Sequence, residues 1–311
     1  MNTRQVAKGD RAFFAISTAA AIFTMLLVLV VLIFLSVKSW STFTEQGISF
    51  VTGSTWDNTT ETGTFQIGPM IVGTIVVSIL GLIIAVPASI AVAFFIEFVA
   101  PPRLARIATS LVDLLAALPS VVVGIWGIFV LSPVAATWSL SLSNTLSFIP
   151  IFRNEFSNAE GAPFIAAWTI AVMIIPIITS VSREVMGRVD KDLISAAIAL
   201  GSTSFSTMRR IIVPNAKSGI LGGILLGLGR ALGETVAIFF VLNLVFEINL
   251  FQILEPKGGN VASLIIAKFG EATPAELNAL MAAGVVLFIL TLIVNMIATS
   301  IVQRAERRMA S

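Results

Sequence analysis

Arg230 and Glu234 are two charged residues inside an otherwise apolar stretch of the chain. A charge near the middle of a lipid bilayer costs about 2.5 to 3.5 kcal/mol, so two charges in one span require compensation. Their i, i+4 spacing predicts that both side chains lie on one helical face and pair. The planar fork of the Arg230 guanidinium suits a tetrahedral oxyanion, and Glu234 would hold that fork when no ligand is present. The pair therefore predicts a path for an anionic substrate, and the alternative is a buried pair that only fixes helix packing.

Glycines extend this predicted face toward the N-terminus. Gly227, Gly223 and Gly219 precede Arg230 at successive intervals of three, four and four residues. Small residues at every fourth position let another helix or a substrate approach the backbone closely. We therefore expect Gly223 and Gly227 to line the substrate path together with Arg230 and Glu234.

The residue types that are missing exclude several other kinds of chemistry. The chain has no Cys, no His and no Tyr, which excludes disulfides, thiolate and imidazole metal ligands, Cys nucleophiles and a Ser-His-Asp relay. It also has no G-x-x-x-x-G-K-[ST] loop that would bind the phosphates of a nucleotide. We therefore expect no catalytic residue, no metal site and no cofactor in this chain, and any energy source must be a separate protein.

The composition of the 311 residues indicates a membrane protein. Hydrophobic residues make up 57% of the chain and charged residues 12%, whereas a soluble fold carries roughly 25% charged residues. A helix that crosses the hydrocarbon layer needs about 20 mostly apolar residues. Runs of this kind occur at about 12–37, 70–99, 107–134, 164–181, 220–246 and 277–302. We therefore predict an all-α membrane protein in which six transmembrane helices form a single domain over 1–311.

The basic residues predict how the chain is oriented in the membrane. With six spans, most of the 19 Lys and Arg residues fall in the segments on one side, which hold both termini and the loop over about 182–217. Positively charged segments are enriched on the cytoplasmic side of membranes. Both termini and this loop are therefore predicted to be cytoplasmic.

The cytoplasmic loop carries a pattern that is typical of a short amphipathic helix. Its apolar residues recur at i, i+3, i+4 and i+7, and they are Leu193, Ala196, Ala197 and Leu200. Asp190 or Asp192 would cap the N-terminus of this helix, and Gly201 would end it.

A second short helix is expected after Ser202 or Ser204, ending near Pro214. Because the apolar stripe of the first helix has no neighbouring domain, it requires a partner. The alternatives are that the hairpin packs back on the membrane domain, that it lies at the lipid surface, or that it docks on another protein.

The spacing of this loop resembles the cytoplasmic signature of ABC-transporter permeases, which reads E-A-A, three residues, G, nine residues, I-x-L-P. The corresponding residues in this chain are Ser195, Ala196, Ala197, Gly201, Ile211, Ile212, Val213 and Pro214. The spacing is intact, while Ser195 replaces the Glu and Val213 replaces the Leu. In that family the loop is a coupling helix that sits in a groove of a cytoplasmic ATPase. The resemblance implies that the apolar stripe, Gly201 and Pro214 connect this chain to an ATPase that binds ATP and Mg.

Two further segments resemble the C-type permease subunits of phosphate-importing ABC transporters. Residues 222–235 read GGILLGLGRALGET, and residues 111–127 read LVDLLAALPSVVVGIWG. The resemblance implies a type I importer permease fold in the bacterial cytoplasmic membrane and movement of inorganic phosphate by alternating access. It also implies that Arg230 and Glu234 take part in phosphate movement. The implied partners are an A-type permease subunit, an ATPase subunit dimer and an extracytoplasmic phosphate-binding protein.

Two other functions remain open at the level of sequence. One is an ABC permease for another oxyanion, such as sulfate or molybdate, or for an amino acid or other small polar solute. The other is an ion-coupled secondary carrier, which would work without an ATPase. The intact cytoplasmic signature and the lack of paired inverted halves argue against the carrier.

Overall fold

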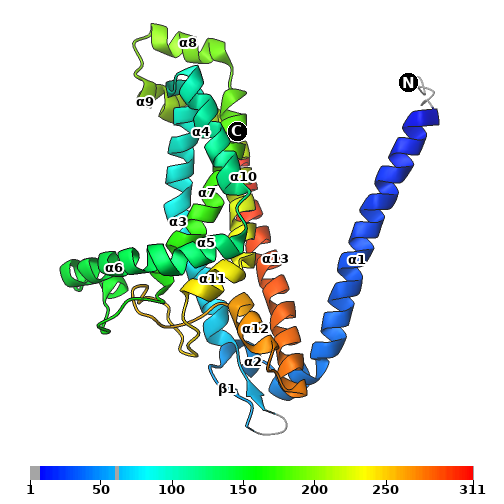
Figure 1. The fold of residues 1–311 in the computed structure, drawn as a ribbon. Helices are drawn as coiled ribbons and strands as arrows, with labels where there is room; N and C mark the ends of the chain where they lie inside the picture. The colour runs from blue at the N-terminus through cyan, green and yellow to red at the C-terminus, as the bar shows by residue number, and fades with distance from the viewer. Residues whose placement is uncertain (1–7, 60–62, 311) are drawn as a thin grey trace.

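The computed structural model describes residues 8–59 and 63–310, and it is almost entirely helical (Figure 1). Within these residues, six helices are long and apolar enough to cross a membrane. Their bounds are Phe13–Gln46, Gly68–Val99, Ser120–Leu146, Pro163–Gly187, Ser204–Gly233 and Pro274–Ser300. The prediction of an all-α protein with six membrane helices is confirmed, and two of the predicted spans need correction.

The central helix of the bundle is α7 (Pro163–Gly187), which has the largest buried share, 61%, of the six spans found in the described residues. It packs against α3 (Gly68–Phe94), which continues as a π-helical segment, η1 (Phe95–Val99), and against α10 (Val213–Gly233). The main apolar core lies between these helices and includes Val77, Ala85, Ile170, Ile174, Ile178 and Ala231. The helix that holds Arg230 is therefore fixed against the best-buried element of the fold.

The third predicted span, 107–134, is wrong because the helix breaks at Leu118 and Pro119. One helix, α4 (Pro102–Ala116), ends before the break, and the next, α5 (Ser120–Trp126), begins after it. Proline disfavours the helical conformation of the residue that precedes it, which accounts for the break. The segment continues from α5 through a π-helical turn, η2 (Gly127–Leu131), into α6 (Ser132–Leu146). Figure 1 shows α5 and α6 running across the bundle, while α4 runs alongside α7.

The fifth predicted span, 220–246, starts too late and ends too late. A nearly continuous helical rod begins with α9 (Ser204–Thr207), passes through the π-helical segment η4 (Met208–Ile212) and continues as α10 to Gly233. The sequence predicts a helix end near Pro214, but Pro214 lies in the first turn of α10, directly after the π-helical segment η4, where the regular hydrogen-bond pattern is already interrupted. A separate short helix, α11 (Val236–Val241), follows the break at Glu234 and Thr235.

The end of the bundle farthest from α8 is closed by short elements. They comprise α2 (Ser49–Thr52), an antiparallel pair of β1 (Trp56–Asp57) with β2 (Thr64–Phe65), and α12 (Val261–Phe269). The 3-10 helix η3 (Pro150–Phe152) contacts α6 instead. The Trp56 indole donates a hydrogen bond to Glu276 Oε1 at 2.8 Å. The loop before α12 lies against α3 so closely that a methyl group on Gly73 would meet the Gly259 carbonyl oxygen at 1.9 Å. These contacts tie the hairpin and the loop to the membrane helices.

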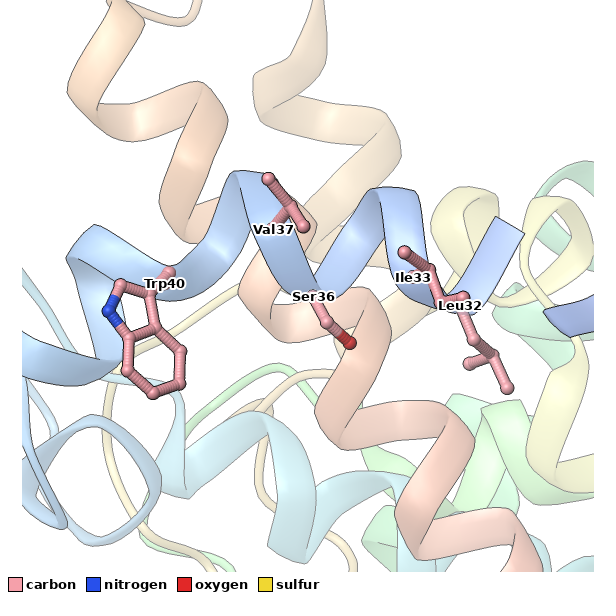
Figure 2. A pocket seen from close by; sticks show the side chains of 5 residues that line it. All are labelled: Leu32, Ile33, Ser36, Val37 and Trp40. Carbon is pink, nitrogen blue, oxygen red and sulfur yellow. The ribbon is translucent and has the colours of Figure 1, made fainter. Parts of the chain in front are cut away.

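The first helix, α1 (Lys8–Gln46), leans away from the bundle, and the most apolar window of its span has no buried residue (Figure 1). Its partner is α13 (Pro274–Ala310). Figure 2 shows a shallow hollow on α1 that is lined by its own residues Leu32, Ile33, Ser36, Val37 and Trp40. Such an apolar surface suits contact with lipid or with another membrane helix.

The start of α1 and the end of α13 lie at the same end of the described structure (Figure 1). Helix α1 begins there and α13 ends there, close to the level of α8 (Lys191–Ala199) and α9 (Figure 1). The placement of this end on the cytoplasmic side of the membrane stays a prediction.

Candidate functional site

Glu234 lies at the junction between α10 and α11, not within a helix. Its backbone is extended, with φ −69° and ψ 130°, and the side chain is 9% exposed. Glu234 Oε1 accepts a hydrogen bond from the backbone N–H of Ala237 at 3.2 Å. The hydroxyl of Thr235 donates to the Gly233 carbonyl at 3.0 Å. Side chains of the junction therefore satisfy backbone groups that the break would otherwise leave unpaired.

Arg230 is half-buried in the last turn of α10, close to the same junction. Its Nε atom is buried and has no hydrogen-bond partner. Among the described residues no ion pair joins Arg230 to Glu234, so the predicted pairing on one helical face is wrong. The reason is that the helix ends at Gly233, and the extended backbone of Glu234 directs its carboxylate to α11.

The site therefore presents a cation with an unsatisfied donor in the membrane-spanning region. An arginine near a helix C-terminus is stabilised by the helix dipole, but a buried N–H without an acceptor remains costly. An anion with several acceptor oxygens would satisfy the guanidinium group of Arg230. Glu234 accepts from the backbone N–H of Ala237 instead, so it does not supply the missing acceptor for Nε of Arg230.

The predicted glycine stripe does not line an open path, and this expectation is corrected. A methyl group on Gly227 would lie 2.8 Å from Ile178 Cδ1, and one on Gly223 would lie 3.1 Å from Val181 Cβ. Both partners belong to α7, so Gly223 and Gly227 allow α10 to pack closely on α7. Gly219 has the same role, since its methyl group would meet Val185 Cγ1 at 2.3 Å.

A different set of glycines on α10 is open. A methyl group on Gly222 or Gly233 would meet no atom within 4 Å. One on Gly229 would meet only Asn295 Nδ2 of α13, at 3.9 Å. Sequence reasoning missed Asn295, although a carboxamide deep inside an apolar span was a visible signal. We call Gly222, Gly229 and Gly233 the open glycine face of α10.

The local structure of the predicted coupling helix is confirmed in detail. Asp190 caps α8, because its Oδ1 accepts a hydrogen bond from the Asp192 N–H at 2.9 Å. Gly201 follows the helix with φ +81°, and the N–H of Ser202 donates to the Ala197 carbonyl at 3.0 Å. This 6→1 bond after a left-handed glycine is the Schellman arrangement that ends helices. The loop itself is shorter than predicted, because α7 ends at Gly187 and the rod of the fifth span begins at Ser204.

The apolar side chains of α8 lie largely on the surface of this chain. Leu193 is 49% exposed, Ile198 60% and Leu200 89%, while Ala197 is the one buried residue of α8. Ser195 is also exposed. The alternative in which the predicted stripe packs back on the membrane domain therefore holds for Ala197 alone, and the rest of the stripe is free for a partner.

Lys257 forms a charged cluster at the opposite end of the molecule. Its Nζ atom lies 3.2 Å from Glu255 Oε2 and 3.5 Å from Glu247 Oε2. Hydrogen bonding to Glu255 raises the pKa of Lys257 above its ordinary value of 10.5. The Glu255 side chain is fully buried, and its Oε1 accepts from the Glu155 backbone N–H at 3.3 Å. Glu255 therefore connects two outer segments, and Lys257 pairs with its carboxylate.

Comparison with known proteins identifies relatives over nearly the whole chain. Residues 85–311 match the family described as binding-protein-dependent transport system inner membrane component. The phosphate transport system permease protein PstC of Pasteurella multocida is 38% identical over 93% of this chain and 90% of its own length. The PstC of Xylella fastidiosa is 36% identical over 97% of this chain and 93% of its own length.

Solved structures with a similar fold include two ABC transporters. A bacterial alginate ABC transporter, solved in complex with an alginate pentasaccharide-bound periplasmic protein, aligns with a TM-score of 0.65 at 17% identity over 96% of both chains. The MetNI methionine ABC transporter in an inward-facing conformation aligns with a TM-score of 0.51 at 15% identity over 76% of this chain and 93% of its own. With its six apolar helices, the chain is a multi-pass inner-membrane protein, and it belongs to the PstC family of phosphate transport system permease proteins.

Proposed function

We propose that this chain is the C-type permease subunit of an ATP-driven importer that moves inorganic phosphate across the inner membrane by alternating access. The observation that carries this proposal is the buried, unpartnered Nε of Arg230 at the junction of α10 and α11. Phosphate offers several acceptor oxygens to a guanidinium fork, which makes it a suitable transient partner. The names of the relatives in the PstC family agree with this substrate.

Glu234 has a separate role in this proposal. Its carboxylate fixes the start of α11 through Ala237, so it sets the geometry of the junction. A carboxylate beside the path also opposes tight binding of an anion, which favours release over retention. Arg230 attracts phosphate, and Glu234 keeps the junction open and the binding weak.

The proposed assembly contains three kinds of partner. A second, A-type (PstA-like) permease subunit would complete the path. A dimer of PstB-like ATPase subunits would bind ATP and Mg and receive α8 together with the residue that follows it. Leu193, Ile198 and Leu200 are exposed there for docking. A PstS-like phosphate-binding protein would deliver phosphate to the end opposite α8. This chain would not break any bond, because hydrolysis would occur in the ATPase.

The capped geometry of α8 suits force transmission. The Asp190 cap and the Schellman bond from Ser202 fix both ends of α8. A displacement of α8 by the ATPase would therefore be transmitted to the rod formed by α9, η4 and α10. That rod ends at Gly233, next to Glu234. Closure of the ATPase would therefore move the junction that carries Arg230 and Glu234, and ATP would bias the states between which the path alternates.

Transport by the assembled complex in vesicles tests this proposal. We expect uptake of labelled phosphate that requires ATP and the loaded phosphate-binding protein, with little uptake of sulfate or molybdate. Uptake of sulfate or molybdate in preference to phosphate would assign the chain to another oxyanion. Isolation of the chain from its native membrane without any ATPase would instead favour an ion-coupled carrier.

A further inference from the structure

Asn295 lies deep in the membrane portion of α13. It precedes Arg304 by nine residues, which places it about 14 Å from that residue along the helix axis. Gly229 follows Lys217 by twelve residues, or about 18 Å along α10. Both positions therefore fall well inside the apolar layer, at comparable depths from the end that holds α8.

The carboxamide of Asn295 faces the open glycine face of α10. Its Nδ2 atom is 3.9 Å from the position that a methyl group on Gly229 would take. Gly229 directly precedes Arg230 in the sequence, and the space beside Gly233 on the next turn is open. The amide of Asn295 is thus directed to the part of α10 that ends at the Arg230 junction.

Asn295 has no hydrogen-bond partner for its side chain among the described residues. A carboxamide has two N–H donors and one acceptor oxygen, and leaving them unpaired in an apolar layer is costly. The backbone groups of Gly229 lie within a regular helix and are not free to pair with it. By contrast Thr291, one turn earlier on α13, donates to the Leu287 carbonyl of its own helix and is satisfied.

We propose that Asn295 is a second contact for the phosphate that passes Arg230, and this inference rests on the proposed function. Its N–H groups donate to phosphate oxygens, and its carbonyl oxygen accepts from the P–OH group that phosphate retains near neutral pH. The hydrogen bonds of the neutral amide are directional and add no charge. Asn295 therefore orients the phosphate, while the positive charge of Arg230 attracts it. Helix α13 then forms one wall of the path and α10 the other.

Phosphate uptake by the complete complex carrying Asn295→Leu or Asn295→Asp tests the inference. Thr291→Val, one turn away on the same face of α13, is the matched control. The wild-type and variant complexes are purified, and rates are expressed per assembled complex. We expect Asn295→Leu to lower phosphate uptake by about tenfold or more, as expected for loss of a hydrogen bond to a charged group. Asn295→Asp should lower it further, because a carboxylate repels the anion. Thr291→Val should leave uptake within twofold.

The ratio of ATP hydrolysed to phosphate moved separates a substrate contact from a packing role. If Asn295 contacts phosphate, Asn295→Leu keeps the ATPase response to the loaded binding protein, and the ratio rises by about the same factor as uptake falls. A parallel loss of uptake and ATPase response, or uptake within twofold of wild type, would overturn the inference. Failure of the wild-type complex to move phosphate would overturn the proposed function instead.

Discussion

A matched pair of alanine substitutions on α10 tests which glycines hold the bundle together. A methyl group on Gly219 would lie 2.3 Å from Val185 Cγ1 and 2.8 Å from Val185 Cβ, whereas one on Gly222 would meet no atom within 4 Å. Valine is stiff about χ1, so Val185 cannot swing away freely and α7 must move. Overpacking of this kind costs about 1 to 3 kcal/mol.

Both substitutions gain the same helix propensity, about 0.5 to 1 kcal/mol. The difference in unfolding free energy between the two variants therefore measures the contact with Val185. We expect Gly219→Ala to be less stable than Gly222→Ala by about 1 to 3 kcal/mol. For chains of 150–250 residues 1 kcal/mol shifts the thermal midpoint by roughly 2 to 4 °C. This longer chain should therefore show a difference of a few degrees.

The assay is thermal unfolding of the two purified variants in the same detergent, followed by circular dichroism. A midpoint for Gly219→Ala several degrees below that of Gly222→Ala is the expected result. Equal midpoints, or a lower midpoint for Gly222→Ala, would refute the assignment of the Gly219, Gly223 and Gly227 face to α7.

Three other substitutions probe the coupling helix and the outer end. Gly201→Pro should uncouple transport from ATP hydrolysis. Proline removes the N–H that donates to the Ile198 carbonyl at 2.9 Å, and its ring forbids the φ of +81°. The variant should still insert into the membrane, while the ATPase activity no longer responds to the loaded binding protein. Lys257→Met should increase proteolysis of 247–257 at neutral pH. Since the pKa of Lys257 is raised in the fold, its stabilising contacts are fully present below 10.5 and should be lost as the pH rises above that value. Trp56→Phe should loosen the β1–β2 hairpin, measured as faster hydrogen exchange, because Glu276 loses the indole donor at 2.8 Å.

The coupling helix could be predicted closely because its signals are local. Asp190 and Gly201 act within a few residues of their own positions, so their spacing alone indicates where α8 begins and ends. The break at Pro119 was also readable, since proline restricts the residue before it. The apolar run that continues past it concealed this signal.

The fifth span and its glycines could not be predicted in the same way. Apolar residues continue from Ile220 to Phe246, so hydropathy gives no sign of the helix break at Glu234. At this break the Glu234 carboxylate accepts a hydrogen bond from the Ala237 N–H. Likewise Gly219 and Gly222 have the same composition around them, and only the position of α7 decides which is packed and which is open. These features depend on neighbouring helices, which the periodicity of one segment does not specify.

The most direct test of the account is phosphate uptake by the complete transporter carrying Arg230→Ala or Arg230→Lys, with Arg103→Ala at the exposed start of α4 as the matched control. Removal of a guanidinium from a desolvated ion contact costs about 2 to 5 kcal/mol, so Arg230→Ala should reduce uptake by about 30-fold or more. Arg230→Lys keeps the positive charge and loses the planar guanidinium, so its phosphate uptake should lie between that of Arg230→Ala and that of wild type. Arg103→Ala should transport normally. Normal uptake by Arg230→Ala at normal protein levels would contradict the account.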